Sequence, residues 1–300
     1  MATTQGWGTA VSPDKLGLVA FMPTPVRGGQ VDREAVQRQL AFLRDSEISV
    51  GVLGGIGEFY ALSLSESLEV IGAAVEGSQS AVPVLAGIGF ATREAVRLAV
   101  GAAREGADGL VINPPYYVHP TPKAFAEHVR AVTEASGLSA VVYSSEFLSV
   151  DDRYLELLID VPGFIGVKEE AVTADEFHRR VRSWGDRLVW WTVGERGSRE
   201  FVKAGAGVVT SSLANISPTL SHACLRAVMD DAADLPPFME KWNVARRAEP
   251  GAEIAVLKHM LSVLRGWPVE VRAPNTPASS DAKREAGRFV EELRSEGWCA

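Results

Sequence analysis

Short runs rich in valine, isoleucine and leucine alternate with longer amphipathic stretches along about the first 230 residues of the chain. Each short run is apolar throughout, which is typical of strands whose two faces are both buried in a parallel sheet. We expect eight such strands, at Leu18–Phe21, Ser49–Leu53, Val82–Gly87, Gly109–Ile112, Ser139–Tyr143, Phe164–Lys168, Leu188–Thr192 and Gly207–Ser211.

The stretches between the runs place apolar residues at helical spacing. Ser63 with Glu66, and Thr173 with Glu176, have the spacing of a capping box, in which the two side chains satisfy backbone N–H groups of the first helical turn. We expect helices at Ala35–Arg44, Ser65–Glu76, Arg93–Glu105, Pro122–Ala135, Asp152–Ile159, Asp175–Ser183 and Ser198–Ala204, with another after Pro218.

Eight strand–helix units in series predict a closed parallel (β/α)8 barrel, the TIM barrel fold. A doubly wound open sheet is the competing architecture. The turn after the first strand, Met22-Pro23-Thr24-Pro25, lacks the glycines of a dinucleotide-binding fingerprint, so we favour the barrel and expect no nicotinamide or flavin cofactor.

The chain beyond the eighth unit predicts a helical extension. We divide the sequence into a barrel at residues 1–230 and an extension at residues 231–300 that packs on it. The extension should contain helices at Phe238–Arg247, at Ile254–Leu264 and from Asp281 to about Ser295.

Composition narrows the classes of partner. The 300 residues are 46% hydrophobic and carry a formal net charge of −8, which argues against binding to nucleic acid or to an anionic membrane surface. The two cysteines, Cys224 and Cys299, lie far apart, and the N-terminus lacks the features of a signal peptide. We expect a cytoplasmic protein that is neither exported nor anchored.

Candidate chemistry gathers at the predicted strand ends, which form the mouth of a barrel of this type. Lys168 ends the sixth apolar run and Tyr143 ends the fifth. A lysine amine at the end of a buried strand is poorly hydrated, so its neutral form is favoured and can attack a carbonyl carbon. A lysine that extends to solvent is the plainer interpretation of Lys168 alone.

Two further loops follow strand ends. The segment Gly54-Gly55-Ile56-Gly57-Glu58-Phe59 follows the second strand, and such a loop either aims backbone N–H groups at a carboxylate or is simply a tight turn. The segment Asn113-Pro114-Pro115-Tyr116-Tyr117 follows the fourth strand and brings two phenols to the mouth, where tyrosines serve packing or catalysis.

These pieces, taken in order, resemble the dihydrodipicolinate synthase/N-acetylneuraminate lyase family of lysine-dependent aldolases and dehydratases of 2-oxo acids. The matching segments cover nearly the whole chain, and as an ordered set they are specific. They are Pro23-Thr24-Pro25, Gly54-Gly55-Ile56-Gly57-Glu58, Pro114-Pro115-Tyr116-Tyr117, Tyr143, Gly166-Val167-Lys168-Glu169, Gly207-Val208-Val209 with Ala214-Asn215, and Val271-Arg272-Ala273-Pro274.

The resemblance implies an assignment of roles. Lys168 would form a Schiff base with the substrate, and Tyr143 would shuttle protons. Tyr117 would reach into the site of a neighbouring subunit in a homotetramer or homodimer. The backbone N–H groups of Gly55 and Ile56 would receive the carboxylate of a small-molecule 2-oxo acid. The chemistry needs no metal, and we expect none.

Some segments depart from the family pattern. Most members carry a hydroxyl residue in the glycine loop where this chain has Ile56. Gly57-Glu58-Phe59 and Gly185-Asp186-Arg187-Leu188 resemble the 5-dehydro-4-deoxyglucarate dehydratase branch, although the segment after Tyr143 has Glu146 in place of a polar, arginine-containing sequence. We therefore expect a less acidic distal end of the substrate, or one bound by Ser211, Ser212, Asn215 or Arg196.

Three functional hypotheses follow. The first is a decarboxylating hydro-lyase similar to 5-dehydro-4-deoxyglucarate dehydratase. The second is a pyruvate-dependent aldolase or a condensing enzyme similar to dihydrodipicolinate synthase. The third is a barrel that has lost catalysis and only binds a ligand, for which Ile56 is an argument and for which Lys168 and Tyr143 are counter-arguments.

Overall fold

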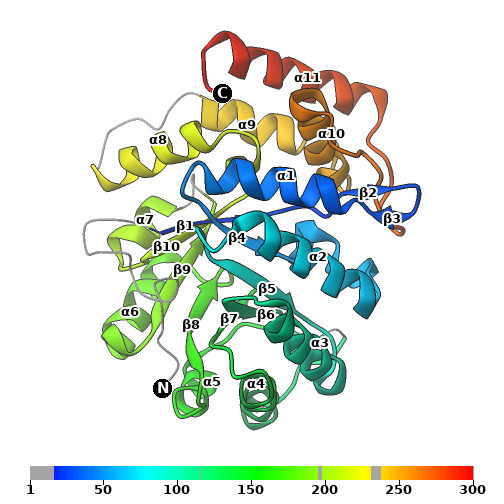
Figure 1. The fold of residues 1–300 in the computed structure, drawn as a ribbon. Coiled ribbons are helices and arrows are strands. Elements are labelled where there is room, and N and C mark those ends of the chain that lie inside the picture. The colour runs from blue at the N-terminus through cyan, green and yellow to red at the C-terminus, as the bar shows by residue number, and fades with distance from the viewer. Residues whose placement is uncertain (1–16, 116, 195–197, 231–237, 300) are drawn as a thin grey trace.

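The structure is a computed structural model that describes residues 17–115, 117–194, 198–230 and 238–299. Its centre is a closed barrel of eight parallel strands surrounded by helices (Figure 1). The barrel strands are β1 (Gly17–Phe21), β4 (Ser49–Val52), β5 (Val84–Ile88), β6 (Gly109–Ile112), β7 (Ala140–Ser144), β8 (Phe164–Glu169), β9 (Val189–Val193) and β10 (Val208–Ser211). The predicted TIM barrel is confirmed, and every predicted strand overlaps an observed one.

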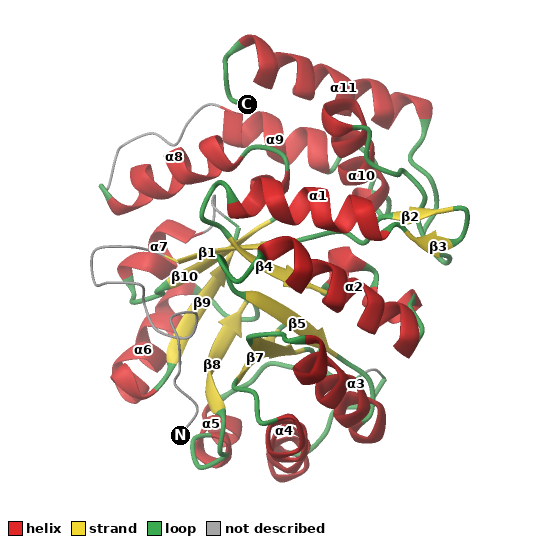
Figure 2. Ribbon diagram, in the orientation of Figure 1, coloured by secondary structure: helices red, strands yellow, loops and turns green. Residues whose placement is uncertain are grey.

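The helices wrap the outside of the barrel (Figure 2). They are α1 (Arg33–Arg44), α2 (Leu64–Ser78), α3 (Thr92–Glu105), α4 (Pro122–Ser136), α5 (Asp152–Leu158), α6 (Ala174–Trp184), α7 (Ser198–Lys203) and α8 (Pro218–Met229). The Ser63 and Glu66 side chains form the predicted capping box at the start of α2. At α6 only half of the box forms, because Thr173 accepts from the Glu176 N–H while the Glu176 carboxylate binds Arg179 and Arg180.

Apolar side chains fill both sides of the barrel wall. Inside, Val19, Leu85, Val111, Val141 and Trp191 belong to one buried cluster. Each large apolar side chain removed from water in this way contributes about 1.5–3 kcal/mol to folding.

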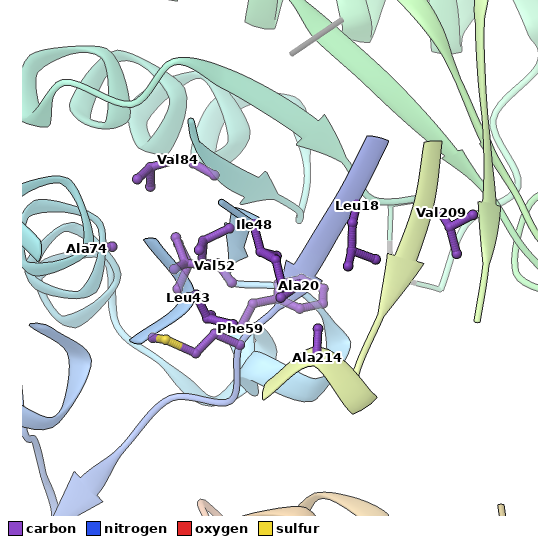
Figure 3. Packing of buried hydrophobic residues seen from close by; sticks show 14 of the residues in the cluster. Leu18, Ala20, Leu43, Ile48, Val52, Phe59, Ala74, Val84, Val209 and Ala214 are labelled. Carbon is purple, nitrogen blue, oxygen red and sulfur yellow. The ribbon is translucent and has the colours of Figure 1, made fainter. Parts of the chain in front are cut away.

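Outside the barrel wall, a larger cluster joins strands to helices. Figure 3 shows Leu18 of β1 and Val209 of β10 in this layer, with Leu43 of α1 and Ala74 of α2. Because alternate strand residues serve the two layers, the strands are apolar throughout, as the sequence indicated.

A short hairpin between β1 and α1 was not predicted. Strands β2 (Val26–Arg27) and β3 (Gln30–Val31) pair in antiparallel fashion across Gly28 and Gly29. Both glycines have positive φ angles, of 59° and 76°, which a two-residue turn of this kind requires. The Gly-Gly pair was the available sequence signal.

Three helices follow the barrel: α9 (Phe238–Arg246), α10 (Glu253–Arg265) and α11 (Ser280–Ser295). They lie together on the side of the barrel that carries α8 and α1 (Figure 1). The three predicted C-terminal helices are thus present, whereas a domain boundary at residue 230 stays a prediction. Within the described ranges, every helix is too short or too polar to cross a bilayer.

Candidate active site

Lys168 lies at the carboxyl end of β8 and points into the barrel mouth. Its side chain is buried, and the residue is only 8% exposed. In the sheet register Lys168 is paired with Tyr143 on β7 and with Trp191 on β9. The Lys168 Nζ atom lies 3.4 Å from the centre of the Tyr143 ring and 5.5 Å from that of Phe21. Two aromatic rings therefore lie near the amine.

This environment makes the Lys168 amine a better nucleophile at neutral pH. Burial lowers the pKa of Lys168 to about 8, because the ammonium form loses its hydration. The nearby Glu170 carboxylate acts in the opposite direction and raises this pKa, but burial is the larger effect. At neutral pH a larger fraction of Lys168 is consequently in the neutral amine form than for an ordinary lysine.

The Tyr143 hydroxyl donates a hydrogen bond to the Glu170 carboxylate. Burial raises the pKa of the Tyr143 phenol, and the hydrogen bond to the carboxylate raises it further. Tyr143 is therefore protonated, with its proton directed at Glu170. Phenol, carboxylate and amine form one contiguous group.

The glycine loop lies on another side of the same mouth. Gly55–Gly57 forms a single turn of 3-10 helix after β4. The first backbone N–H groups that form hydrogen bonds within the turn are those of Gly57 and Glu58. The N–H groups of Gly55 and Ile56 therefore have no partner within the turn. Gly55 and Ile56 both line the cavity that contains Lys168, which is the position expected of a carboxylate-binding turn.

Glu58 connects this loop to the C-terminal helices. The Glu58 carboxylate is fully buried and forms an ion pair with Lys258 of α10. It also accepts hydrogen bonds from the Arg272 backbone N–H, at 2.7 Å, and from the Asn275 side chain, at 3.0 Å. The extension thus fixes the conformation of the glycine loop.

The mouth of the barrel holds a cavity of about 790 Å³. Lys168, Tyr143 and Glu170 line one part of it, together with the glycine loop. Its other part is lined by residues of α7 and of α9, so the C-terminal extension helps to enclose the site.

Arginines concentrate at this second part of the cavity. Arg199 comes from α7, Arg246 ends α9, and Arg247 follows it. The guanidinium of Arg246 donates to the Ser212 hydroxyl at 3.4 Å. Glu146, which we expected to make the distal region unfavourable for an anion, is exposed and is not among the residues that line the cavity.

Of the substrate-binding residues predicted at the end of the eighth strand, some line the cavity and one does not. Ser211 and Ser212 line the cavity. Asn215 does not: its side chain is buried, and its amide donates to the Phe21 carbonyl at 2.7 Å and to that of Ser212 at 3.2 Å. The contact of Asn215 with the substrate stays a prediction, and in the structure its amide braces the loop. Arg196, the remaining candidate, lies outside the described residues.

Tyr117 is not part of the main cavity. It lines a second, largely apolar cavity of about 530 Å³, which shares Gly55, Asn113 and Tyr143 with the first. Tyr117 is fully exposed in the single chain and has a positive φ angle of 64°. Its neighbour Tyr116 lies outside the described residues.

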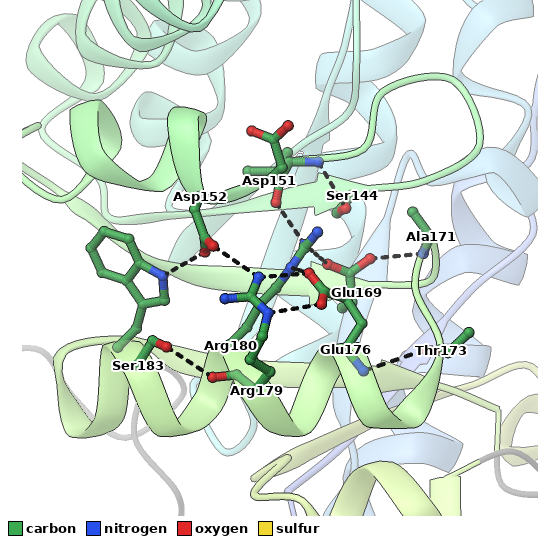
Figure 4. Close-up of polar contacts among 12 residues, drawn as sticks. Ser144, Asp151, Asp152, Glu169, Ala171, Thr173, Glu176, Arg179, Arg180 and Ser183 are labelled. Atoms are coloured by element: carbon green, nitrogen blue, oxygen red, sulfur yellow. Dashed lines mark hydrogen bonds and ion pairs between the residues drawn. The ribbon is translucent and has the colours of Figure 1, made fainter.

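A buried charged network supports the strand that carries Lys168. Glu169, the next residue, faces away from the mouth and forms an ion pair with Arg180 of α6 at 3.0 Å (Figure 4). Arg180 also donates to the Val150 carbonyl at 2.8 Å. These contacts hold the end of β8 against α6 and the segment that precedes α5.

Sequence reasoning missed Glu170 and the three arginines as site residues. Glu170 could have been found, because it follows Lys168 at the end of a strand beside Tyr143. Arg246 and Arg247 gave no such signal, since only the packing of α9 over the barrel brings them to the site.

Comparisons with known proteins agree with this geometry. The sequence model of the Dihydrodipicolinate synthetase family matches residues 14–293. A probable 5-dehydro-4-deoxyglucarate dehydratase from Bradyrhizobium sp. strain BTAi1 is 28% identical over 92% of each chain. A 4-hydroxy-tetrahydrodipicolinate synthase from Nitrobacter hamburgensis is 30% identical over 88% of this chain and 91% of its own.

Solved structures show the same fold. Dihydrodipicolinate synthase from Bacillus clausii superposes with a TM-score of 0.83 at 26% identity, covering 93% of this chain and 97% of that one. A Ruminococcus gnavus sialic acid aldolase, in its catalytic lysine mutant, has a TM-score of 0.85 at 18% identity, covering 94% and 97%. The chain therefore belongs to the dihydrodipicolinate synthetase family, and it is a lyase of the kind that uses a lysine Schiff base.

Proposed function

We propose that the protein is a decarboxylating hydro-lyase similar to 5-dehydro-4-deoxyglucarate dehydratase, which removes water and carbon dioxide from its substrate to give 2,5-dioxopentanoate. The observation that carries the Schiff-base chemistry is the buried Lys168 amine, held 3.4 Å from the Tyr143 ring centre at the mouth of the barrel. The relatives of that name support the choice of reaction.

In the proposed mechanism, the neutral Lys168 amine attacks the C2 ketone of the 2-oxo acid and water leaves. The product is an iminium ion, whose positive nitrogen withdraws electrons and acidifies the C3 protons. A C3 proton and the C4 hydroxyl group then leave as a second molecule of water. The conjugated iminium ion accepts the electron pair that is released when the distal carboxylate leaves as carbon dioxide, and protonation of carbon followed by hydrolysis of the Schiff base frees the product and the Lys168 amine. Tyr143 would donate and accept protons during these steps.

The two ends of the cavity suit the two ends of such a substrate. The N–H groups of Gly55 and Ile56 would bind the carboxylate next to the ketone. Arg246, Arg247 and Arg199 would bind a second carboxylate, since a guanidinium forms strong charge-assisted hydrogen bonds with carboxylates. The arginines support a diacid substrate and favour the dehydratase over reactions of substrates with one carboxylate.

Ser211 and Ser212 complete the proposed binding surface. Both line the cavity, and Ser212 already accepts a hydrogen bond from Arg246. Their hydroxyl groups would contact the polar middle of the substrate.

A pyruvate-dependent aldolase or a dihydrodipicolinate synthase-like condensing enzyme is the second candidate. It would use the same Lys168 and Tyr143, and a synthase relative at 30% identity supports it. Product analysis separates the two: dioxopentanoate and carbon dioxide from dehydroglucarate support the dehydratase, and pyruvate from a hydroxy-oxo acid supports the aldolase. Failure of borohydride to trap any 2-oxo acid on the protein would favour a binding barrel without catalysis.

We propose that a neighbouring subunit covers the second cavity. Exposed apolar side chains at its rim, Tyr117, Val118 and Phe147, suit contact with another copy of the chain. A homodimer would be the minimum unit and a homotetramer the expected one, with Tyr117 close to the neighbour's site. A cytoplasmic location is proposed as well, and the two free cysteines accord with it.

A further inference from the structure

The Tyr143 hydroxyl is hydrogen-bonded to a carboxylate in a cavity that a hydrocarbon side chain also lines. Ile56, on the glycine loop of the same cavity, offers a hydrocarbon side chain with no proton to exchange. The Tyr143 hydroxyl instead donates to the Glu170 carboxylate, and this carboxylate lines the cavity with Lys168. The phenol therefore has a carboxylate acceptor for its proton.

We propose that Glu170 is the acid–base partner of Tyr143, storing one proton during formation of the Schiff base and returning it when water leaves. This rests on the proposed function. It adds to that function a proton reservoir that replaces a hydroxyl relay through the glycine loop.

Every proton is accounted for in the proposed formation of the Schiff base. The neutral Lys168 amine attacks the ketone, and the ammonium nitrogen of the adduct gives one proton to Glu170 by way of Tyr143. Solvent supplies one proton to the former carbonyl oxygen, which completes the carbinolamine. Glu170 then returns its proton through Tyr143 to that hydroxyl group, which leaves as water. The products are the iminium ion, one water molecule and the original Glu170 carboxylate.

The backbone holds Glu170 in position for this exchange. Its N–H donates to the Ser144 carbonyl at 2.9 Å, which ties the residue to the strand that carries Tyr143. The side chain is exposed toward the cavity, so its carboxylate can lose and regain a proton without the penalty of deep burial. Glu169, by contrast, is bound to Arg180 behind the barrel wall and cannot reach the site.

Other charges that line the cavity set the background for this titration. Arg199 and Glu200 come from α7, and Arg246 and Arg247 come from α9 and the residue after it. Outside the cavity lining, the Glu146 and Glu169 carboxylates also raise the pKa of the Tyr143 phenol.

The test uses the full-length protein and the rate at which borohydride traps pyruvate on Lys168. Glu170→Gln keeps the shape of the side chain but cannot store a proton. We expect its trapping rate to fall by roughly 10²-fold at pH 7.5, which is typical of the loss of a general acid–base group. Glu170→Asp should retain part of the rate. Glu127→Gln, a change of an exposed glutamate on α4 that does not line the cavity, should leave it unaltered.

The pH profile gives a readout that a structural role would not move. The Glu170 carboxylate raises the pKa of Lys168, so the rise of the trapping rate with pH should move to lower pH in Glu170→Gln. The maximal trapping rate of Glu170→Gln at high pH should stay below that of the parent protein. A parent-like rate and profile in Glu170→Gln would overturn the proposal.

A double-mutant cycle identifies the route of the proton. If Glu170 acts through Tyr143, then Glu170→Gln should slow trapping little further in a Tyr143→Phe protein. Equal and additive losses would overturn the relay. If the parent protein traps no 2-oxo acid at all, the proposed function itself is wrong, which is distinct from trapping that is independent of Glu170.

Discussion

The Lys168 amine and the Tyr143 ring are register partners on adjacent strands, and the Nζ atom lies 3.4 Å from the ring centre. Their contact is therefore fixed by backbone pairing in the sheet and does not depend on a flexible loop. A slip of β8 by one residue would turn Lys168 out of the mouth, because successive strand side chains face opposite ways. The ion pair of Glu169 with Arg180 works against such a slip.

Replacement of Lys168 by alanine should abolish turnover and borohydride trapping. The reason is that in the proposed mechanism the covalent intermediate forms on its amine. We expect the thermal midpoint to stay the same or to rise, since a buried amine is costly to keep in the folded protein. Mass spectrometry of trapped peptides and a melting curve measure the two effects. Turnover equal to that of the parent would exclude the covalent mechanism.

The rate of Schiff-base formation should rise with pH through about 8. Burial lowers the pKa of Lys168 to about 8, and only the neutral amine attacks the ketone. Below this pKa the neutral fraction falls tenfold for each pH unit, so the rate should fall with it. Stopped-flow or quenched-flow trapping between about pH 6 and about pH 9 would measure this rise of the rate with pH. A rate independent of pH in this range would mean that amine deprotonation does not control the step.

The sequence was sufficient to predict the barrel and the positions of Lys168 and Tyr143 at its mouth. Lys168 and Tyr143 each end a run of apolar residues, and strand ends meet at one face of a parallel barrel. The Gly55–Ile56 turn could be predicted for the same reason. These features depend on local pattern and on a fold with a fixed polarity.

The remaining features depend on tertiary packing. Arg246 reaches the cavity because α9 packs over the barrel, which no local pattern in the chain specifies. Asn215 was expected at the substrate, but the 3-10 turn that contains it directs its amide to the Phe21 carbonyl. The exposure of Tyr117 is a property of the single chain, and its role stays a prediction.

Replacement of Arg246 by methionine should weaken binding of diacid substrates selectively. Loss of a charge-assisted hydrogen bond costs about 1.5–3 kcal/mol, which corresponds to roughly a 10–100-fold increase in KM for a 2-oxo diacid. Trapping of pyruvate, which has one carboxylate, should be nearly unaffected. Arg288→Met, a change at an exposed arginine of α11, is the matched control. Equal losses with both acids would show that Arg246 supports the site without contacting the second carboxylate.

Replacement of Lys258 by methionine tests the link between the extension and the glycine loop. The change leaves the Glu58 carboxylate buried without its cation, which should lower the free energy of unfolding by about 3–5 kcal/mol in urea denaturation. The hydrogen bonds from Arg272 and Asn275 to Glu58 would remain, so the lower end of this range is expected.

A second change should offset part of that loss. Glu58→Gln in the Lys258→Met background removes the unpaired charge, so the double variant should be more stable than Lys258→Met alone. Lys241→Met, at an exposed ion pair with Glu292, should cost less than about 1 kcal/mol. Because Glu58 holds the turn that presents the Gly55 and Ile56 N–H groups, Lys258→Met should also raise KM for pyruvate trapping. A large loss of stability with an unchanged KM would show that the extension stabilises the barrel without shaping the carboxylate site.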